Sequence, residues 1–110
     1  MTSTAQPAIV LVLTTIGADA DAVALARTLV DERLAACVNV LPAMTSVYRW
    51  KGQVEQDREQ QIVIKTTAGR VAALETRMRE LHPYDLPEFV VVAATSGSAD
   101  YLAWVGESVS

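Results

Sequence analysis

The amino-acid sequence predicts an α+β fold in which two strand, helix, strand halves share one sheet. The apolar periodicity indicates strand, helix, strand, strand, helix and strand, followed by a terminal helix. A weak internal echo supports two related halves, because residues 12–15 (VLTT) resemble residues 64–67 (IKTT), 52 positions later. Two such halves form the split βαβ arrangement, so we expect a ferredoxin-like βαββαβ fold with a long β-hairpin and a C-terminal helix.

The right-handed crossover rule sets the expected order of the strands. We expect the first and third strands to lie side by side at the centre, parallel to each other, with both helices on one face of the sheet. The other face then needs a cover. Since 51% of the 110 residues are hydrophobic, we expect the sheet of another subunit to cover it.

Length and composition are those of one domain. A chain of 110 residues with this hydrophobic content fits a single core. We expect a flexible N-terminus over residues 1–7 and a single domain over residues 8–110. No stretch approaches the ~20 consecutive apolar residues of a membrane-spanning helix. The first seven residues also lack the basic and apolar regions of a signal peptide.

The charge pattern excludes two classes of partner. The chain carries 13 acidic and 9 basic side chains, a formal charge of −4, and no long basic cluster. Nucleic acid and anionic membranes are poor partners for such a surface. Cys37 is the only cysteine, which indicates a reducing compartment, so we expect a cytoplasmic protein. In its apolar strand Cys37 is expected to be a small core residue.

The first predicted strand and helix follow from a change of period. Residues 8–16 form a nearly unbroken apolar, β-branched run, as in a strand covered on both faces, and Gly17 ends it. Apolar residues then recur at helical spacing, which predicts a helix over about residues 19–35, capped by Asp19 or Asp21.

A long hairpin follows. The sequence predicts a strand over residues 37–41, an interruption at Pro42 and a resumed strand over residues 45–50. Lys51–Gly52 suits a two-residue turn, and residues 53–67 form the return strand. The hairpin is long enough to project beyond a small domain, and we expect it to clasp another subunit.

Two prolines delimit the segment that follows the second helix. This helix is predicted from residue 68 or 69 to His82, because Pro83 disfavours helical angles in its predecessor. Pro87 suits the start of a final strand over about residues 88–96. Ser98 is the expected N-cap of the last helix.

The sequence contains no strong catalytic or metal-binding motif, so we do not expect an enzyme. His82, the only histidine, can act as a cation at the end of its helix. Lys65 lies in an expected central strand, where an ammonium group is costly unless it meets a carboxylate such as Glu59 or Glu88.

Several motifs together resemble the CutA family, the divalent-cation tolerance proteins. They span roughly residues 9–107 and stand in the family's order: LAACVN at 34–39, YRWKG at 48–52, IKTT at 64–67, HPYDLPE at 82–88 and YLAW at 101–104. The resemblance implies a ferredoxin-like subunit in a tight homotrimer, with three sheets packed around a threefold axis and the hairpins reaching across to neighbours.

The resemblance also implies a link to copper and other divalent metal ions. His82 matches the histidine of the family's His-Pro-Tyr motif and Glu88 its glutamate, so these two are the expected metal-binding residues. Some members have a cysteine at the position of Thr14 and a second histidine at that of Leu81. Copper prefers such thiolate and imidazole ligands, so the site expected here is less selective for it.

Two alternatives come from other classes of protein. The architecture of the family resembles that of the trimeric PII signalling proteins, which implies a cleft between subunits for a small molecule or ion. Its expected lining, besides His82 and Glu88, consists of Tyr48, Trp50, Glu59, Lys65, Tyr84 and Trp104. The other alternative is a stable trimeric scaffold for partner proteins.

Overall fold

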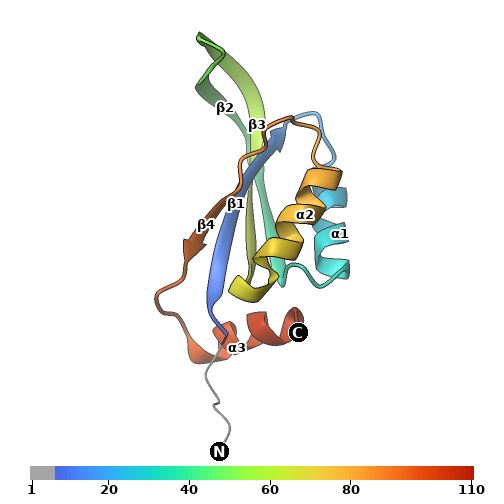
Figure 1. Ribbon diagram of the computed structural model, residues 1–110, viewed down its shortest axis with the longest axis vertical. Coiled ribbons are helices and arrows are strands. Elements are labelled where there is room, and N and C mark those ends of the chain that lie inside the picture. Colours follow the sequence, from blue (N-terminus) through green and yellow to red (C-terminus); the bar gives the residue numbers. More distant parts are fainter. Residues whose placement is uncertain (1–6) are drawn as a thin grey trace, which may run out of the picture.

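The computed structural model describes residues 7–110 and contains one four-stranded sheet with three α-helices (Figure 1). The expectation of a flexible N-terminus concerns residues that, except for Pro7, lie outside this range. In chain order the elements are β1 (Ile9–Gly17), α1 (Ala22–Asp31), β2 (Cys37–Trp50), β3 (Gln53–Thr67), a 3-10 turn (Ala68–Arg70), α2 (Val71–Leu81), β4 (Val90–Ala93) and α3 (Ala99–Ser108). The predicted α+β order is confirmed.

The strands lie in the order β2-β3-β1-β4, and all three neighbouring pairs are antiparallel. The prediction that the first and third strands occupy the centre is confirmed, but the prediction that they are parallel is wrong. The crossover rule relates β1 to β2, which do run in the same direction. β3 reverses direction at the Lys51–Gly52 turn and inserts between them, so it is antiparallel to both.

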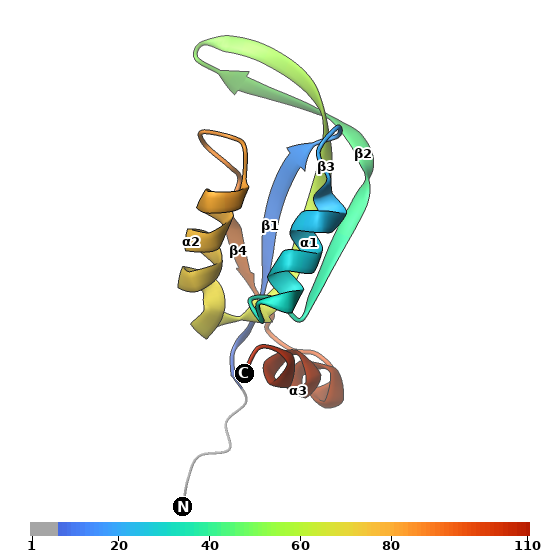
Figure 2. The same ribbon diagram turned by 90° about the vertical axis from the view of Figure 1, so that its right-hand side faces the viewer.

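Helices α1 and α2 lie side by side on one face of the sheet (Figure 2). Side chains alternate between the faces of a strand, and those of Val12 and Ile64 point into the core against Leu29 and Leu74. All four are fully buried. Helix α3 lies at one end of the sheet, where Val105 and its neighbours form a second small cluster. Most of the other face of the sheet is left without a helix.

Several predicted boundaries shift. Helix α1 is shorter than predicted, because Asp21 caps it by accepting from the Ala24 N–H over 3.0 Å and Arg33 ends it in a left-handed conformation with φ of 60°. Strand β4 is limited to Val90–Ala93. Helix α2 ends at Leu81, and His82 is extended with ψ of 133°, as the following proline requires. Ser98 caps α3, accepting from the Tyr101 N–H over 3.2 Å.

A bulge in β2 decides which side chains reach the face without helices. The pairing of β2 with β3 shifts by one residue between Val40 and Ala43, so the strand continues through Pro42 rather than stopping there. Before the bulge Val40 pairs with Ile62 on the helix side, and after it Tyr48 pairs with Glu55. One extra residue reverses the alternation, so Tyr48 and Trp50 share the face of the odd-numbered residues of β3. Beyond the bulge, β2 and β3 form an arm that extends past the rest of the molecule (Figure 1).

Candidate functional site

A cleft of about 900 Å³ lies between the arm and the segment that follows α2. We call it the arm cleft. The face without helices supplies its floor, and residues 83–88 form one wall. Its lining comprises Thr15, Gly17, Asp19, Met44, Ser46, Tyr48, Trp50, Asp57, Arg58, Glu59, Gln61, Pro83, Tyr84, Asp85, Leu86, Pro87 and Glu88.

His82 fastens the segment after α2 to the sheet. Its Nε2 lies 2.5 Å from the carbonyl oxygen of Thr15, and its Nδ1 accepts from the Tyr84 N–H over 3.1 Å. A carbonyl can only accept, so Nε2 carries the proton and the ring is neutral with both nitrogens in use. Only 7% of His82 is exposed. The prediction that His82 is a cation on the last carbonyls of its helix is therefore wrong. The partner is a carbonyl of β1.

Tyr84 continues this connection to β3. Its ring packs edge-on against His82, with centroids 4.7 Å apart, and its hydroxyl donates to Oε2 of Glu59 over 2.8 Å. Burial and then the hydrogen bond to Glu59 raise the pKa of Tyr84 above its usual value. Glu59 itself is only 8% exposed and lines the arm cleft.

Tyr48 makes the corresponding contact within the arm. Its hydroxyl donates to Oδ2 of Asp57, the residue diagonally opposite on β3. This hydrogen bond, together with partial desolvation and the charge of nearby carboxylates, raises the pKa of Tyr48 to about 12. The phenol therefore stays neutral and remains a donor over the whole physiological range of pH.

Gln61 holds Glu88 at the far side of the cleft. The Gln61 side-chain amide donates from Nε2 to the carbonyl oxygen of Thr14 over 2.7 Å and to Oε2 of Glu88 over 3.1 Å. Glu88 is half-buried. The start of the segment leading to β4 is thus fixed to the central strands by a neutral donor.

The arm cleft is strongly acidic. Its lining includes five carboxylates, of Asp19, Asp57, Glu59, Asp85 and Glu88, but only one basic side chain, Arg58. Arg58 donates to the Thr45 hydroxyl over 3.1 Å. Within residues 7–110 the ion pairs join Arg77 to Glu32 and Glu80, and Arg79 to Glu75, all outside the cleft. The negative charge of the cleft is therefore not balanced by salt bridges inside the described chain.

Of the eight residues predicted to line the cleft, His82 is not among those that line the arm cleft, and the other seven fall into two groups. The first group lines the arm cleft: Tyr48, Trp50, Glu59, Tyr84 and Glu88. The second group lies at α3: Trp104 belongs to this helix, and Lys65 of β3 lies beside it. Lys65 Nζ is 5.7 Å from the centroid of the Tyr101 ring, which lies 5.6 Å from the Trp104 ring. The expected ion pair of Lys65 with Glu59 or Glu88 is not formed within residues 7–110.

The metal-binding residues expected from the sequence have other partners here. Both nitrogens of His82 are hydrogen-bonded, so binding a metal through this ring requires the loss of one of those bonds. Among the described residues, no three side chains of His, Cys, Asp or Glu are grouped closely enough to hold a metal ion. Cys37 is half-buried and pairs with Lys65. It lies on the other side of the bulge from the arm cleft.

Sequence reasoning missed Asp57 and Gln61. The role of Asp57 could have been predicted from the hairpin register. A two-residue turn at Lys51–Gly52 pairs Ser46 with Asp57, so Tyr48 lies diagonally opposite Asp57. No comparable pattern in the sequence predicted the contact of Gln61 with Glu88. Its contact with Glu88 joins positions 27 residues apart and depends on how the segment after α2 folds back.

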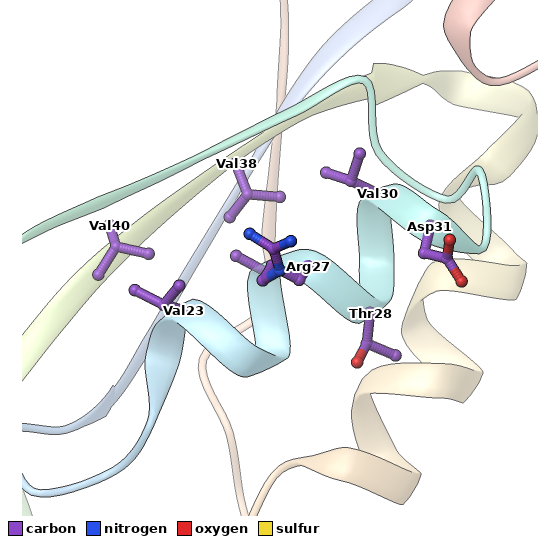
Figure 3. Close-up of a pocket in the computed structure, with 8 residues that line it drawn as sticks. Val23, Arg27, Thr28, Val30, Asp31, Val38 and Val40 are labelled. Carbon is purple, nitrogen blue, oxygen red and sulfur yellow. The ribbon is translucent and has the colours of Figure 1, made fainter.

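A second, apolar groove of about 790 Å³ lies between α1 and the edge strand β2 (Figure 3). Val23, Val30, Val38 and Val40 line it, with Arg27 at its side. None of the residues predicted to bind a ligand lies there.

Comparisons with known proteins agree on one family. A model of the CutA1 divalent ion tolerance protein family matches residues 10–108. The divalent-cation tolerance protein CutA of Thermus thermophilus is 43% identical over 98 residues, covering 89% of this chain and 95% of that protein. The protein of the same name from Pectobacterium atrosepticum is 43% identical over 100 residues, covering 91% of each.

Solved structures extend the likeness to the fold. CutA1 from Oryza sativa matches with a TM-score of 0.91 at 33% identity, covering 96% of both chains. The divalent cation tolerance protein from Thermus thermophilus matches with a TM-score of 0.89 at 41% identity, covering 93% of this chain and 99% of that one. The sequence resemblance, the matched family model and the shared fold agree, and this chain belongs to the CutA1 family of divalent ion tolerance proteins.

Proposed function

We propose that this protein acts in divalent-cation tolerance as a homotrimer without catalytic activity, and that it binds divalent cations such as Cu²⁺ in the arm cleft. One observation carries the proposal. The cleft carboxylates of Asp57, Glu59 and Glu88 accept hydrogen bonds from neutral donors only, two phenols and one amide. Neutral donors orient a carboxylate but leave its charge in place, so the cleft attracts cations.

Glu88 is the first ligand in this proposal. It is more accessible than Glu59, and the Gln61 amide leaves its other oxygen free for a cation. His82 is the second proposed ligand, and it becomes available if the segment after α2 moves and releases one ring nitrogen. Carboxylate oxygen and imidazole nitrogen are both acceptable ligands for Cu²⁺.

The trimer explains the exposed apolar surface. On the face without helices, Leu13 pairs with Val63 and with Val90, and Val90 and Val92 are exposed on β4. The arm also exposes Val47 and Val54, but these two share the opposite face of β3, that of its even-numbered residues. Exposed apolar residues gathered on one face, as on β4, are typical of an interface. A homotrimer would also bring additional ligands to each arm cleft.

Calorimetric titration with Cu²⁺ tests the cation site. We expect binding by the unmodified protein and at least a tenfold loss of affinity in Glu88→Gln, which removes the charge but keeps the shape. Glu107→Gln on α3 is the matched control and should bind as the unmodified protein does, since Glu107 lies outside the cleft. Unchanged binding by Glu88→Gln would refute this site, and His82→Gln tests the second ligand separately.

A small organic ligand is the second candidate. Tyr48, Trp50 and Tyr84 give the arm cleft aromatic walls that an ion does not need, and about 900 Å³ is within the usual size of a small-molecule site. With such a ligand, the protein would resemble the PII signalling proteins in binding a small molecule in a cleft. A metabolite screen by thermal shift tests this, because a ligand that prefers the folded protein raises its melting temperature.

We also propose that the protein works in the cytoplasm, since a lone half-buried cysteine suits a reducing compartment. No helix of residues 7–110 has the length and apolar character needed to cross a membrane. A similar structure from Archaeoglobus fulgidus, with a TM-score of 0.88 at 25% identity over 93% of this chain and 99% of that one, is described as a periplasmic protein. Cell fractionation with an antibody against this chain distinguishes the two compartments.

A further inference from the structure

Three carboxylates of the arm cleft keep their charge because only neutral groups donate to them. Glu59 is 8% exposed, and its Oε2 accepts from the Tyr84 hydroxyl while its Oε1 makes no hydrogen bond within residues 7–110. Asp57 and Glu88 likewise each accept a hydrogen bond at one oxygen only. None of the three forms an ion pair within that range. Since a carboxylate removed from water is costly unless an opposite charge compensates it, a cation that enters the cleft would stabilise them.

The three carboxylates lie in a row. Asp57 and Glu59 are alternate residues of β3 on the face without helices, and Gln61, the next residue on that face, holds Glu88. Alternate residues of a strand are about 7 Å apart, so the carboxylates follow one another at intervals of roughly that length. Among the described residues, no three side chains of His, Cys, Asp or Glu are close enough together to surround one metal ion. The row therefore favours an elongated cation that carries several separate charges.

Aromatic rings line the cleft beside this row. Tyr48, Trp50 and Tyr84 belong to its lining, and each is between 37% and 40% exposed. Both phenol hydroxyls already donate to carboxylates, so these rings offer a ligand their apolar surfaces. Methylene groups pack on aromatic rings, and ammonium groups are attracted to ring faces. The Lys51 ammonium, 5.7 Å from the centroid of the Trp50 ring, is an example within the chain.

The one basic side chain of the lining does not interrupt the row. Arg58 lies between Asp57 and Glu59 in the sequence, so its side chain starts from the opposite face of β3. Its guanidinium donates to the hydroxyl of Thr45, its partner in the pairing of β2 with β3. Between positions 57 and 61, the face without helices therefore carries no basic side chain of β3.

We propose that the arm cleft binds a linear aliphatic polyamine, whose ammonium groups pair with Asp57, Glu59 and Glu88 and whose methylene segments pack on the aromatic rings. The inference rests on the second function proposed above, a small organic ligand in this cleft. A cleft of about 900 Å³ has room for such a molecule. The ammonium groups of a polyamine are separated by short methylene segments, as the carboxylates are separated along the strand. The methylenes also make the apolar contacts that a metal ion cannot make.

Calorimetric titration with spermidine, a linear triamine, tests the class of ligand. Hexaamminecobalt(III) is the matched control ligand, because it carries the same charge in a compact shell without methylenes. The titrations are made at physiological ionic strength, where salt screens general attraction to an acidic surface. We expect spermidine to bind at least tenfold more tightly than the cobalt complex. Equal binding of the two, or no binding of spermidine, would overturn the proposal.

Variants of the lining test the residues. Glu59→Gln and Asp57→Asn each remove one charge and keep an acceptor for the tyrosine hydroxyl, and we expect roughly tenfold weaker spermidine binding from each. Trp50→Leu should weaken it severalfold, and since Trp50 is exposed, this variant keeps the test valid if a carboxylate variant does not fold. Glu55→Gln is the matched control, because Glu55 shares the strand and face of Glu59 but lies outside the cleft lining. An equal loss in Glu55→Gln would indicate general attraction to the arm and overturn the proposal.

These outcomes separate the inference from the proposed functions. If spermidine does not bind but another organic compound raises the melting temperature, the polyamine is refuted and the small-molecule function stands. If Cu²⁺ binding depends on Glu88 and spermidine does not bind, the cation site stands and the polyamine is again refuted. Spermidine binding that depends on Asp57 and Glu59 supports the inference even where Cu²⁺ binding is insensitive to Glu88→Gln.

Discussion

The hydroxyl of Tyr84 donates a hydrogen bond to Oε2 of Glu59 over 2.8 Å, and this bond joins the segment after α2 to the central strand β3. On the other side of Tyr84, its backbone N–H donates to His82, which is itself bonded to β1. One wall of the arm cleft is therefore held by a continuous chain of hydrogen bonds that begins and ends on the sheet.

Removing the Tyr84 hydroxyl should destabilise the protein. In Tyr84→Phe the buried carboxylate of Glu59 loses its donor, and we expect the free energy of unfolding to fall by about 1–3 kcal/mol. Guanidinium denaturation at fixed protein concentration measures this free energy of unfolding. Tyr101→Phe is the control, because the Tyr101 hydroxyl makes no hydrogen bond within the described residues. Equal stability of the two variants would contradict the importance of this bond.

The phenol of Tyr48 should lose its proton at a higher pH than an ordinary tyrosine does. Its pKa is raised from 10.0 to about 12 by the hydrogen bond to Asp57, so the neutral form is favoured in the folded protein. The resulting stability is fully present below pH 10.0 and is lost as the pH rises through about 12. A pH titration followed by the ultraviolet absorbance of phenolate should show one fewer tyrosine ionising near pH 10 in the unmodified protein than in Asp57→Asn. Identical titration curves would contradict the assignment.

The two helices on the covered face are joined by a forked ion pair. Arg77 of α2 donates from Nε and Nη2 to the two carboxylate oxygens of Glu32, each over 2.9 Å. The hydrogen bond from Arg77 lowers the pKa of Glu32 below 4.5. The ion pair therefore stabilises the folded state above pH 4.5, and this contribution is lost as the pH falls through the lowered pKa of Glu32.

Arg77→Met should accordingly lower the melting temperature at pH 7, and the difference from the unmodified protein should disappear in strong acid. Arg79→Met is the matched control, since Arg79 pairs with Glu75 of its own helix and is more exposed. We expect a smaller effect from that variant, because exposed pairs within a helix contribute little. A loss at pH 7 that persists unchanged in acid would indicate lost packing rather than the ion pair.

Arg33 is a position where glycine should be better. It follows the end of α1 with φ of 60°, a left-handed conformation that is unfavourable for residues with a Cβ. Arg33→Gly should therefore raise the free energy of unfolding by up to about 1 kcal/mol. Arg27→Gly, inside the same helix, should lower it by about 1 kcal/mol. Thermal denaturation of both variants checks the pair, and destabilisation by Arg33→Gly would contradict the reasoning.

Local chemistry allowed much of the fold to be predicted. Pro83 correctly predicted the end of α2, and Lys51–Gly52 correctly predicted the hairpin turn, where both residues have positive φ. These features depend on one or two residues and their allowed dihedral angles. The direction of β3 relative to β1 was predicted wrongly, because the crossover rule was applied to the wrong pair of strands.

The arm cleft was only partly predictable. The pairing of aromatic with charged residues drew attention to Tyr48, Glu59 and Tyr84, and all three line the arm cleft. The predicted return strand over residues 53–67 already separated Lys65 from Glu59 by about 20 Å, and the structure confirms that strand. The expected pairing of Lys65 with Glu59 within one chain was therefore inconsistent with it. The bulge at Leu41–Pro42 was visible only as an interruption. Its effect on which face Tyr48 occupies depends on the register with β3.

The mass of the protein in solution decides whether the arm cleft can be completed by another copy. Light scattering coupled to size-exclusion chromatography should give three times the 11.8 kDa of one chain, and the value should persist on dilution to low micromolar concentration. A mass equal to that of one chain would contradict the homotrimer.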